Sequence, residues 1–275
     1  MNEHLAYICV ACGTQYPPSA EPLARCAICS DPRQFIGLDG QQWITLEQLR
    51  QGHGNVFLTE ESGVYSIFTE PAFGIGERAF LIQTPTGNVL WDCIALIDQP
   101  SIDAIRRMGG IDAIAISHPH YYTTMIEWSA AFGNAPIHIH ASDQAWVMRP
   151  HENVRFWLGE TLNLLDGLML IHTPGHFDGF QVLHWRDGAG GKGVLFSADQ
   201  PQVCMDPQWL SFMYSYPNLI PLDPESVQNI VRILEPWSFD RIYGAFPKRT
   251  VASEAKARLH ASVQRYLKAV GFRYH

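Results

Sequence analysis

The chain has 275 residues, of which 47% are hydrophobic and 17% are charged, and its formal net charge is -8 at pH 7. This composition predicts a packed globular core, and the acidic balance argues against a basic surface for nucleic acid or an anionic membrane. No apolar run approaches the roughly 20 residues that span a bilayer, and Met1–Cys12 lacks the basic start of a signal peptide. We therefore expect a cytoplasmic protein with no nucleic-acid or membrane partner.

Residues 1–36 differ in composition from the rest of the chain, because they hold four cysteines and four prolines with little apolar periodicity. A segment this short cannot bury enough surface to fold without a cross-link or a metal. Cys9 and Cys12 form one Cys-x-x-Cys pair, and Cys26 and Cys29 form a second. Each pair directs two thiolates at one point, so two pairs complete a tetrahedral shell. The sequence predicts a zinc-ribbon-like module over residues 1–36.

Four protein ligands leave no open position, so the metal in this module is expected to have a structural role. Zn²⁺ is expected there rather than a rubredoxin-like iron. Gly13, directly after the first pair, allows the positive φ that such turns often need. The alternative of four independent buried thiols does not explain two pairs at this spacing in a segment without a core. Contact between two copies of the chain in a homodimer is an alternative role for the module. Cys93 and Cys204 stand alone and are interpreted as core or incidental residues.

From residue 37 onward, expected strands and helices alternate without a fixed repeat, which predicts one α/β domain over residues 37–275. Helices are expected over residues 45–50, 101–108, 123–132, 224–234 and 253–270, with another beginning at 142–147. Strands are expected over residues 63–69, 79–83, 88–91, 111–117, 136–140, 168–172, 180–185, 194–197 and 241–243. The glycine-rich residues 188–193 lie between two of these strands and lack the ending of a phosphate loop. We interpret them as a hairpin turn.

Histidines and a carboxylate follow three of the expected strands. The strand over 111–117 runs into His118 and His120, which project to the same side if the segment is extended. Pro119 between them removes a donor and stiffens the segment. His176 and Asp199 follow later strands. Three strand-end loops can meet at one edge of a sandwich, and a set of three histidines with an aspartate suits Zn²⁺ or Fe²⁺.

In order and placement these residues resemble the metallo-β-lactamase superfamily, over roughly residues 55–250. That family has an HxHxDH loop, a later Gly-His loop, a strand-end aspartate and a last histidine after a C-terminal strand. The corresponding segments are residues 117–124, 175–179, 197–200 and 243–246. Asp92 matches an early strand-end aspartate that is generally structural in the family. The resemblance implies an αββα sandwich behind the N-terminal cysteine module.

The sequence departs from the family pattern at the positions that serve only a second metal. These positions hold Tyr122, Thr123 and Ala245 in place of an aspartate and two histidines. The positions that serve the first metal, and the carboxylate that normally bridges the two, are kept as His118, His120, His176 and Asp199. Random substitution would remove ligands of both metals, whereas here only the second-metal positions have changed. The resemblance therefore implies one active-site metal ion.

The absence of the second-metal ligands also leaves the identity of the catalytic base open. Tyr122 occupies the position of the family's loop aspartate, which usually orients the attacking water, so Asp199 serves as a ligand or as the base. Asp178 and Glu127 are substitutes, although solvated or capping carboxylates are the more ordinary interpretation of both.

Several other residues receive a weaker functional interpretation. His138 and His140 share one face of a strand and are interpreted as structural. His172 lies on the strand that leads to His176 and is expected to orient it. The aromatic stretch 209–216 either packs in the core, which we favour, or lines a substrate pocket.

The resemblance implies a metal-dependent hydrolase with one Zn²⁺, or as second choice Fe²⁺, at the histidines. Such a metal polarises a carbonyl or phosphoryl oxygen or lowers the pKa of water toward about 7. The expected partner is a small-molecule substrate: an ester, thioester, lactone or phosphoester. One alternative is a mononuclear iron oxidoreductase on the same fold, and another is a non-catalytic binding protein that keeps the scaffold.

Overall fold

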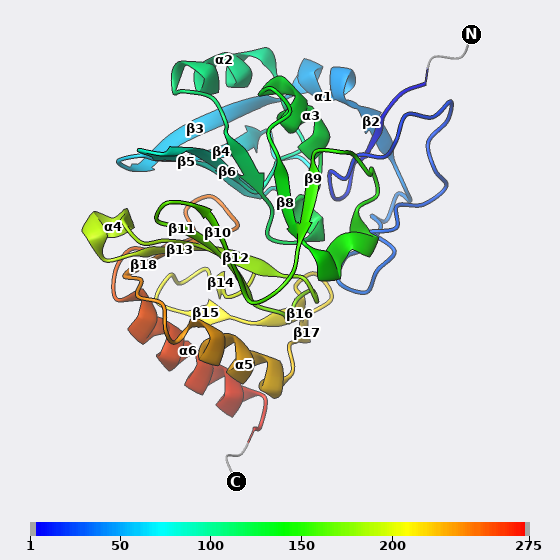
Figure 1. The fold of residues 1–275 in the computed structure, drawn as a ribbon. Helices are drawn as coiled ribbons and strands as arrows, with labels where there is room; N and C mark the ends of the chain where they lie inside the picture. The colour runs from blue at the N-terminus through cyan, green and yellow to red at the C-terminus, as the bar shows by residue number, and fades with distance from the viewer. Residues whose placement is uncertain (1–3, 273–275) are drawn as a thin grey trace. The chain divides into compact units, whose positions relative to one another are not determined.

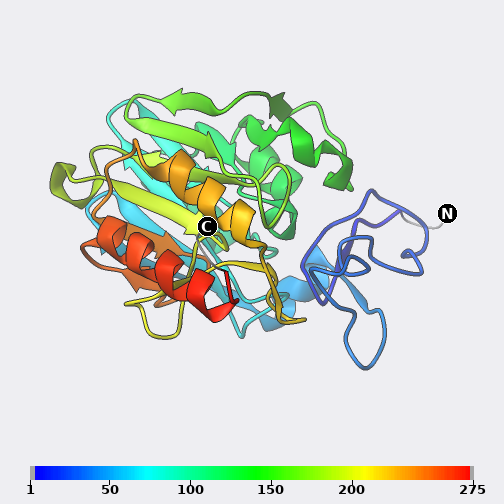
Figure 2. The same cartoon turned by 90° about the horizontal axis from the view of Figure 1, so that it is seen from below.

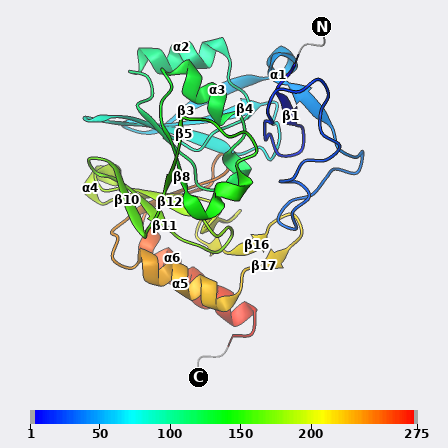
Figure 3. The same cartoon turned by 45° about the vertical axis from the view of Figure 1, so that its right-hand side comes forward.

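The computed structural model describes residues 4–272, and the chain divides into two compact units, residues 1–157 and 158–275. Each unit carries one large sheet with its own helices (Figure 1). The boundary predicted between residues 36 and 37 stays a prediction. A two-stranded ribbon, beside α1 in Figure 3, pairs strands on either side of that boundary: β1 (Tyr7–Cys9) and β2 (Trp43–Thr45).

The first unit contains a seven-stranded sheet in which the strands follow one another in chain order. Its strands are β3 (Gly54–Glu61), β4 (Val64–Glu70), β5 (Arg78–Thr84), β6 (Gly87–Trp91), β7 (Ala113–Ala115), β8 (Ile137–His140) and β9 (Val154–Trp157). Strands β3 to β6 pair antiparallel, and β6 to β9 pair parallel. Parallel neighbours need a crossover connection, so helices separate these strands along the chain.

The helices of the first unit begin at residues that suit helix starts. They are α1 (Leu46–Gly52), α2 (Gln99–Arg107) and α3 (Met125–Ala131), with two 3₁₀ turns, η1 (Pro119–Tyr121) and η2 (Ala141–Trp146). Thr45 and Gln48 form a capping box at α1. Asp98 caps α2 by accepting from the N–H of Ser101 at 2.9 Å. Helices α2 and α3 connect β6 to β7 and β7 to β8, which places the loop after β7 at the carboxyl edge of the parallel strands.

The second unit contains a six-stranded sheet in the order β10-β11-β12-β13-β18-β19. Its elements are β10 (Thr161–Leu165), β11 (Leu168–His172), β12 (Gln181–Trp185), α4 (Gly188–Gly191), β13 (Val194–Ala198), α5 (Pro224–Leu234), β18 (Arg241–Gly244), β19 (Thr250–Val251) and α6 (Ala255–Ala269), with short strands β14 (Gln202–Val203), β15 (Leu210–Ser211), β16 (Met213–Ser215) and β17 (Ile220–Pro221). Helices α5 and α6 lie side by side along this sheet (Figure 2).

Most predicted elements are present within a few residues of their expected bounds, and three predictions need correction or refinement. The helix expected to begin at 142–147 is the 3₁₀ turn η2. The strand expected over 111–117 is shorter, and the extended segment expected over 118–120 ends at His118, because the 3₁₀ turn η1 begins at Pro119. Residues 188–193 do connect an antiparallel pair, but they form the helical turn α4. Strands β3, β9 and β10 and the short strands β1, β2, β14 to β17 and β19 were not predicted. Among residues 4–272, no helix has the length and apolar character that crossing a bilayer requires.

Candidate metal centres

The cysteine cluster comprises Cys9, Cys12, Cys26 and Cys29, all buried in the first unit. Strand β1 ends at Cys9, and the N–H of Gly13 turns back to the Cys9 carbonyl at 2.8 Å with a φ of 78° at Gly13. The Sγ–Sγ distances are 3.7 Å for both Cys9–Cys29 and Cys12–Cys26. Four sulfurs at about 2.3 Å from one tetrahedral Zn²⁺ would be about 3.8 Å apart. The spacing fits such an ion, and the predicted four-cysteine cluster is confirmed.

Neighbouring groups orient the sulfurs and separate the thiol pKa values. Gln41 donates from Nε2 to the Cys9 Sγ at 3.2 Å, and its Oε1 accepts from the Cys26 N–H at 2.9 Å. The hydroxyl of Tyr16 donates to the Cys26 Sγ at 3.4 Å. The hydrogen bond from Cys12 lowers the pKa of Cys9, whereas burial raises the pKa of Cys12. Burial and mutual repulsion oppose ionisation of all four thiols, so a cation among them, as a metal site supplies, is needed to hold all four as thiolates.

The first half of the predicted active site is the histidine loop, residues 117–124, in the first unit. Asp92, at the end of β6, accepts from the N–H of Ser117 at 2.7 Å, which fixes the start of the loop. The Ser117 hydroxyl is 2.8 Å from Nδ1 of His118, so Nε2 is the nitrogen of that ring that can bind a metal. Possible ligand atoms of His118 and His120 lie within 4.8 Å of each other, and both side chains are buried.

The backbone conformation that brings the two imidazoles together differs from the extended one that was expected. His118 is extended, with a φ of -166°, but the chain then enters the 3₁₀ turn η1, and His120 lies inside that turn. The ring centroids of the two histidines are 4.9 Å apart with their planes at 72°. Pro119, expected only to stiffen the segment, stands at the first turn of η1, where its missing N–H costs nothing. Burial holds the pKa of His118 below its usual range, which favours the neutral imidazole that binds metals.

The second half of the predicted site, His176 and Asp199, lies in the second unit. Gln200 holds the loop after β11, because its Oε1 accepts from the His176 N–H at 2.6 Å and its Nε2 donates to the Thr173 carbonyl at 2.6 Å. Nδ1 of His176 is 3.0 Å from the Met213 carbonyl, which makes Nε2 the metal-facing nitrogen. A Cβ on Gly175 would lie 2.5 Å from Gln200 Oε1, so a larger residue there would displace the Gln200 amide that holds the loop.

Asp199 directly follows β13 and is 4% exposed. Its Oδ1 accepts from Nε2 of Gln202 at 2.8 Å, and its backbone carbonyl accepts from the Tyr216 hydroxyl at 2.8 Å. A carboxylate oxygen of Asp199 and a ring nitrogen of His176 lie within 4.8 Å of each other. The Tyr216 ring centroid is 5.9 Å from that of His176, so one end of the aromatic stretch 209–216 contacts the metal-ligand candidates. Phe212, by contrast, is fully buried against Tyr266.

The three replaced positions are occupied by groups poorly suited to a second metal. Tyr122 is 2% exposed, its hydroxyl has no hydrogen-bond partner among the described residues, and burial raises its pKa well above 10. Thr123 donates its hydroxyl to the Cys93 carbonyl at 3.1 Å. Ala245 has no donor atom on its side chain and is buried beside the end of β13.

The remaining candidates lie in ordinary structural positions. The side chain of Asp178 is exposed. Glu127 pairs with Arg149 at 2.7 Å. Nε2 of His172 is 2.7 Å from the Asp178 carbonyl, so His172 anchors the loop that carries His176. It was expected to orient the ring of His176, but the Met213 carbonyl does so instead.

The two histidines of β8 also have structural surroundings. His140 accepts at Nδ1 from the Ser142 N–H and packs edge-on against Trp157. Burial lowers the pKa of His138, and the nearby Arg155 lowers it further.

The residues that position the ligand candidates were not predicted from the sequence. Ser117, Gln200, Gln202 and Met213 were not singled out, although Ser117 and Gln200 each stand next to a predicted ligand. Their position next to a predicted ligand is the feature of the sequence that could have identified Ser117 and Gln200. Met213 contributes only a backbone carbonyl, and because every residue type has one, the sequence does not identify this contact.

Solved structures show which fold this is. The chain matches VMB-1 with a TM-score of 0.58 and 13% identity, covering 79% of this chain and 98% of that one. It matches the metallo-β-lactamase FIM-1 from Pseudomonas aeruginosa, solved in its mono-zinc form, with a TM-score of 0.56 and 13% identity over 77% and 95%. The protein has the metallo-β-lactamase fold, as predicted, with a four-cysteine cluster added near the N-terminus.

A closer relative is found at the level of sequence. The chain is 49% identical over 266 residues to the uncharacterized protein YmaE of Bacillus subtilis (strain 168), covering 96% of each protein. It belongs to the same family as YmaE. No family model matches the chain.

Proposed function

We propose that the protein is a metal-dependent hydrolase with one Zn²⁺ bound by His118, His120, His176 and Asp199. The observation that carries the proposal is that the full first-metal set is present and buried, whereas the second-metal positions hold Tyr122, Thr123 and Ala245. Each half of the ligand set has the outer hydrogen bonds that orient metal-binding histidines. FIM-1, on the same fold, has been solved in a mono-zinc form.

The chain's own residues supply orientation and proton transfer. A bound Zn²⁺ would polarise a carbonyl or phosphoryl oxygen of the substrate. Tyr122 is unsuited to accept a proton at neutral pH, because burial raises its pKa and it holds its proton more tightly. Asp178 is exposed, and Glu127 is paired with Arg149. Asp199, oriented by Gln202, is therefore the carboxylate that we assign as proton acceptor as well as ligand.

The substrate proposed is a small molecule with an ester, thioester, lactone or phosphoester bond. The test is turnover of such a panel by zinc-loaded protein, with Asp199→Asn and His176→Ala as variants. Asp199→Asn should lower kcat by about 100-fold or more while metal binding largely persists, because an amide keeps an oxygen but accepts no proton. His176→Ala should lose both metal and activity.

Two experimental results would contradict the proposed hydrolase activity. Full zinc occupancy without turnover on the whole panel would favour a binding protein. Oxygen uptake by an iron-loaded form, with no hydrolysis by the zinc form, would favour the iron oxidoreductase.

A further inference from the structure

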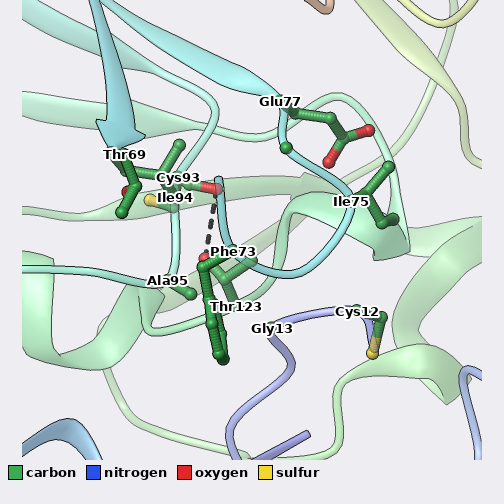
Figure 4. Close-up of a pocket in the computed structure, with 11 residues that line it drawn as sticks. Cys12, Gly13, Thr69, Phe73, Ile75, Glu77, Cys93, Ile94, Ala95 and Thr123 are labelled. Atoms are coloured by element: carbon green, nitrogen blue, oxygen red, sulfur yellow. Dashed lines mark hydrogen bonds between the residues drawn. The ribbon is translucent and has the colours of Figure 1, made fainter. Parts of the chain in front are cut away.

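The cysteine cluster packs against the histidine loop within the first unit. A Cβ added to Gly13 would lie 3.0 Å from Cβ of Ala95 and 3.3 Å from Cγ2 of Thr123. On another side, a Cβ on Gly74 would lie 3.2 Å from the backbone of Cys12 and Gly13. Figure 4 shows Cys12, Gly13, Ala95 and Thr123 around a cavity of about 20 Å³, which has room for about one water. The segment after the first cysteine pair therefore has little freedom to move alone.

A backbone hydrogen bond joins the two segments. The N–H of Gln15 donates to the Thr123 carbonyl at 3.1 Å. Thr123 follows His120 by three residues and has a φ of 20°, an uncommon value for a residue with a side chain. Its hydroxyl donates to the Cys93 carbonyl at 3.1 Å, drawn as a dashed line in Figure 4. The end of the histidine loop is thus held by Gln15 on one side and by the chain after β6 on the other.

A side-chain link runs parallel to the backbone bond. Arg149 donates from Nη1 to Oε1 of Gln15 and also to Oε1 of Glu127, the latter at 2.7 Å. Glu127 belongs to α3, the helix that follows the histidine loop. Gln15 therefore contacts the loop directly and its following helix through Arg149.

We propose that the metal-bound cysteine cluster positions the histidine loop through Gly13 and Gln15, and so raises the metal affinity of the histidine site. The proposal rests on the proposed metal site at the histidines. Among residues 4–36, the four cysteines make up most of one buried cluster, together with only Tyr16 and Ile28, so we expect the contact of this segment with Thr123 to depend on metal in the cluster. Thermodynamic coupling is reciprocal: metal at the histidines should strengthen metal binding by the cysteines by the same factor.

The first experiment measures Zn²⁺ affinity at the histidine site by chelator competition, in Cys26→Ala and in Cys204→Ala as the matched control. Cys26→Ala should weaken binding at the histidines by about tenfold, within the usual range of coupling between two sites. Cys204→Ala should leave it unchanged, because Cys204 lies outside the cluster. Equal affinity in the two variants would overturn the proposal.

A second pair of variants separates loss of the contact from loss of the cluster. Gln15→Pro removes the N–H that reaches Thr123 but keeps all four cysteines, whereas Gln15→Ala keeps that N–H and removes only the side chain. The proline variant should keep the metal of the cysteine cluster and bind metal at the histidines several-fold more weakly than the alanine variant. Equal affinities at the histidines would contradict the role given to this bond.

Hydrogen exchange tests the same inference without a metal at the histidines. In a His176→Ala background, removing the cluster metal through Cys26→Ala should speed exchange of residues 117–124 and leave residues 241–251 unchanged. If the wild-type histidines bind no metal, the proposed function fails, yet faster loop exchange would still support positioning by the cluster. Unchanged exchange of the loop would overturn it.

Discussion

The two candidate metal centres differ in how their side chains are brought together. The cysteine ligands all come from residues 9–29, and two short turns bring their sulfurs to the spacing of a tetrahedral site. The histidines and the aspartate come from residues 118–199, from the ends of several strands, and each half depends on other residues for its orientation. A site built locally is expected to stabilise its own segment. A site built from distant strands depends on the fold for its geometry.

Breaking the local site should have the largest effect. Cys26→Ala removes one of four thiolates, and metal binding supplies most of the folding free energy of small zinc modules, about 10–16 kcal/mol in zinc-finger peptides. We expect loss of one metal and rapid proteolysis within residues 1–36, with the large sheets still folded. Limited proteolysis with mass spectrometry checks this, with Cys204→Ala as the control. Protease resistance at full metal content would contradict the structural role.

Breaking the distant site should affect metal binding with little effect on folding. His176→Ala is expected to weaken binding at the histidine site by more than about 100-fold, beyond the loss that outer partners cause. His260→Ala on α6, a partly exposed histidine that pairs with Glu235, is the matched control. Zinc titration with thermal unfolding checks both. Unchanged affinity in His176→Ala would show that the third ligand is another residue.

Loosening the support of a ligand should have a smaller effect than removing the ligand. Ser117→Ala deletes the hydroxyl that contacts Nδ1 of His118, which should lower metal affinity by about tenfold. Ser253→Ala, whose side chain is exposed, is the control. An affinity equal to the control would mean that the backbone bond from Ser117 to Asp92 is sufficient to orient the ring.

The smallest predicted effect concerns pH and a histidine outside both centres. Burial lowers the pKa of His184, which contacts the Ser238 carbonyl at 2.7 Å from Nε2. The unfolded chain then takes up a proton more readily than the folded one. The contribution of His184 to stability is present above the unfolded pKa, about 6.5, and is lost as the pH falls below it. In His184→Gln, the melting temperature should fall less steeply between pH 7 and pH 5 than in wild type. An equal slope would assign the pH dependence to other groups.

The local and distant sites also differ in how well a sequence predicts them. The Cys-x-x-Cys pairs specify their geometry within a few residues, and the structure has the expected cluster. The ligand candidates near the strand ends were also found, but their local geometry was not. His118 and His120 were expected on an extended segment, whereas Pro119 starts a 3₁₀ turn. Periodicity reports which residues are buried, and it does not report where a loop turns.

Supporting residues were the hardest to predict, because their roles come from tertiary contacts. Gln200 is an ordinary glutamine in sequence, yet it holds His176 and Thr173 together. The contact between Gln15 and Thr123 joins residues far apart in the chain, and a backbone N–H has no residue signature. Strand β3 was missed because its residues are half-buried or exposed and give no clear alternation.

Binding of a single metal ion at the histidines is tested most directly by the number and position of metal ions in protein purified without chelators. Elemental analysis combined with anomalous scattering should give two ions per chain, one at the four cysteines and one at His118, His120 and His176. Tyr122, Thr123 and Ala245 offer too little for another ion, since one hydroxyl is held protonated by burial, one donates to Cys93 and alanine has no donor. Two ions about 4 Å apart at the histidines, the spacing of two-metal sites, would contradict the account.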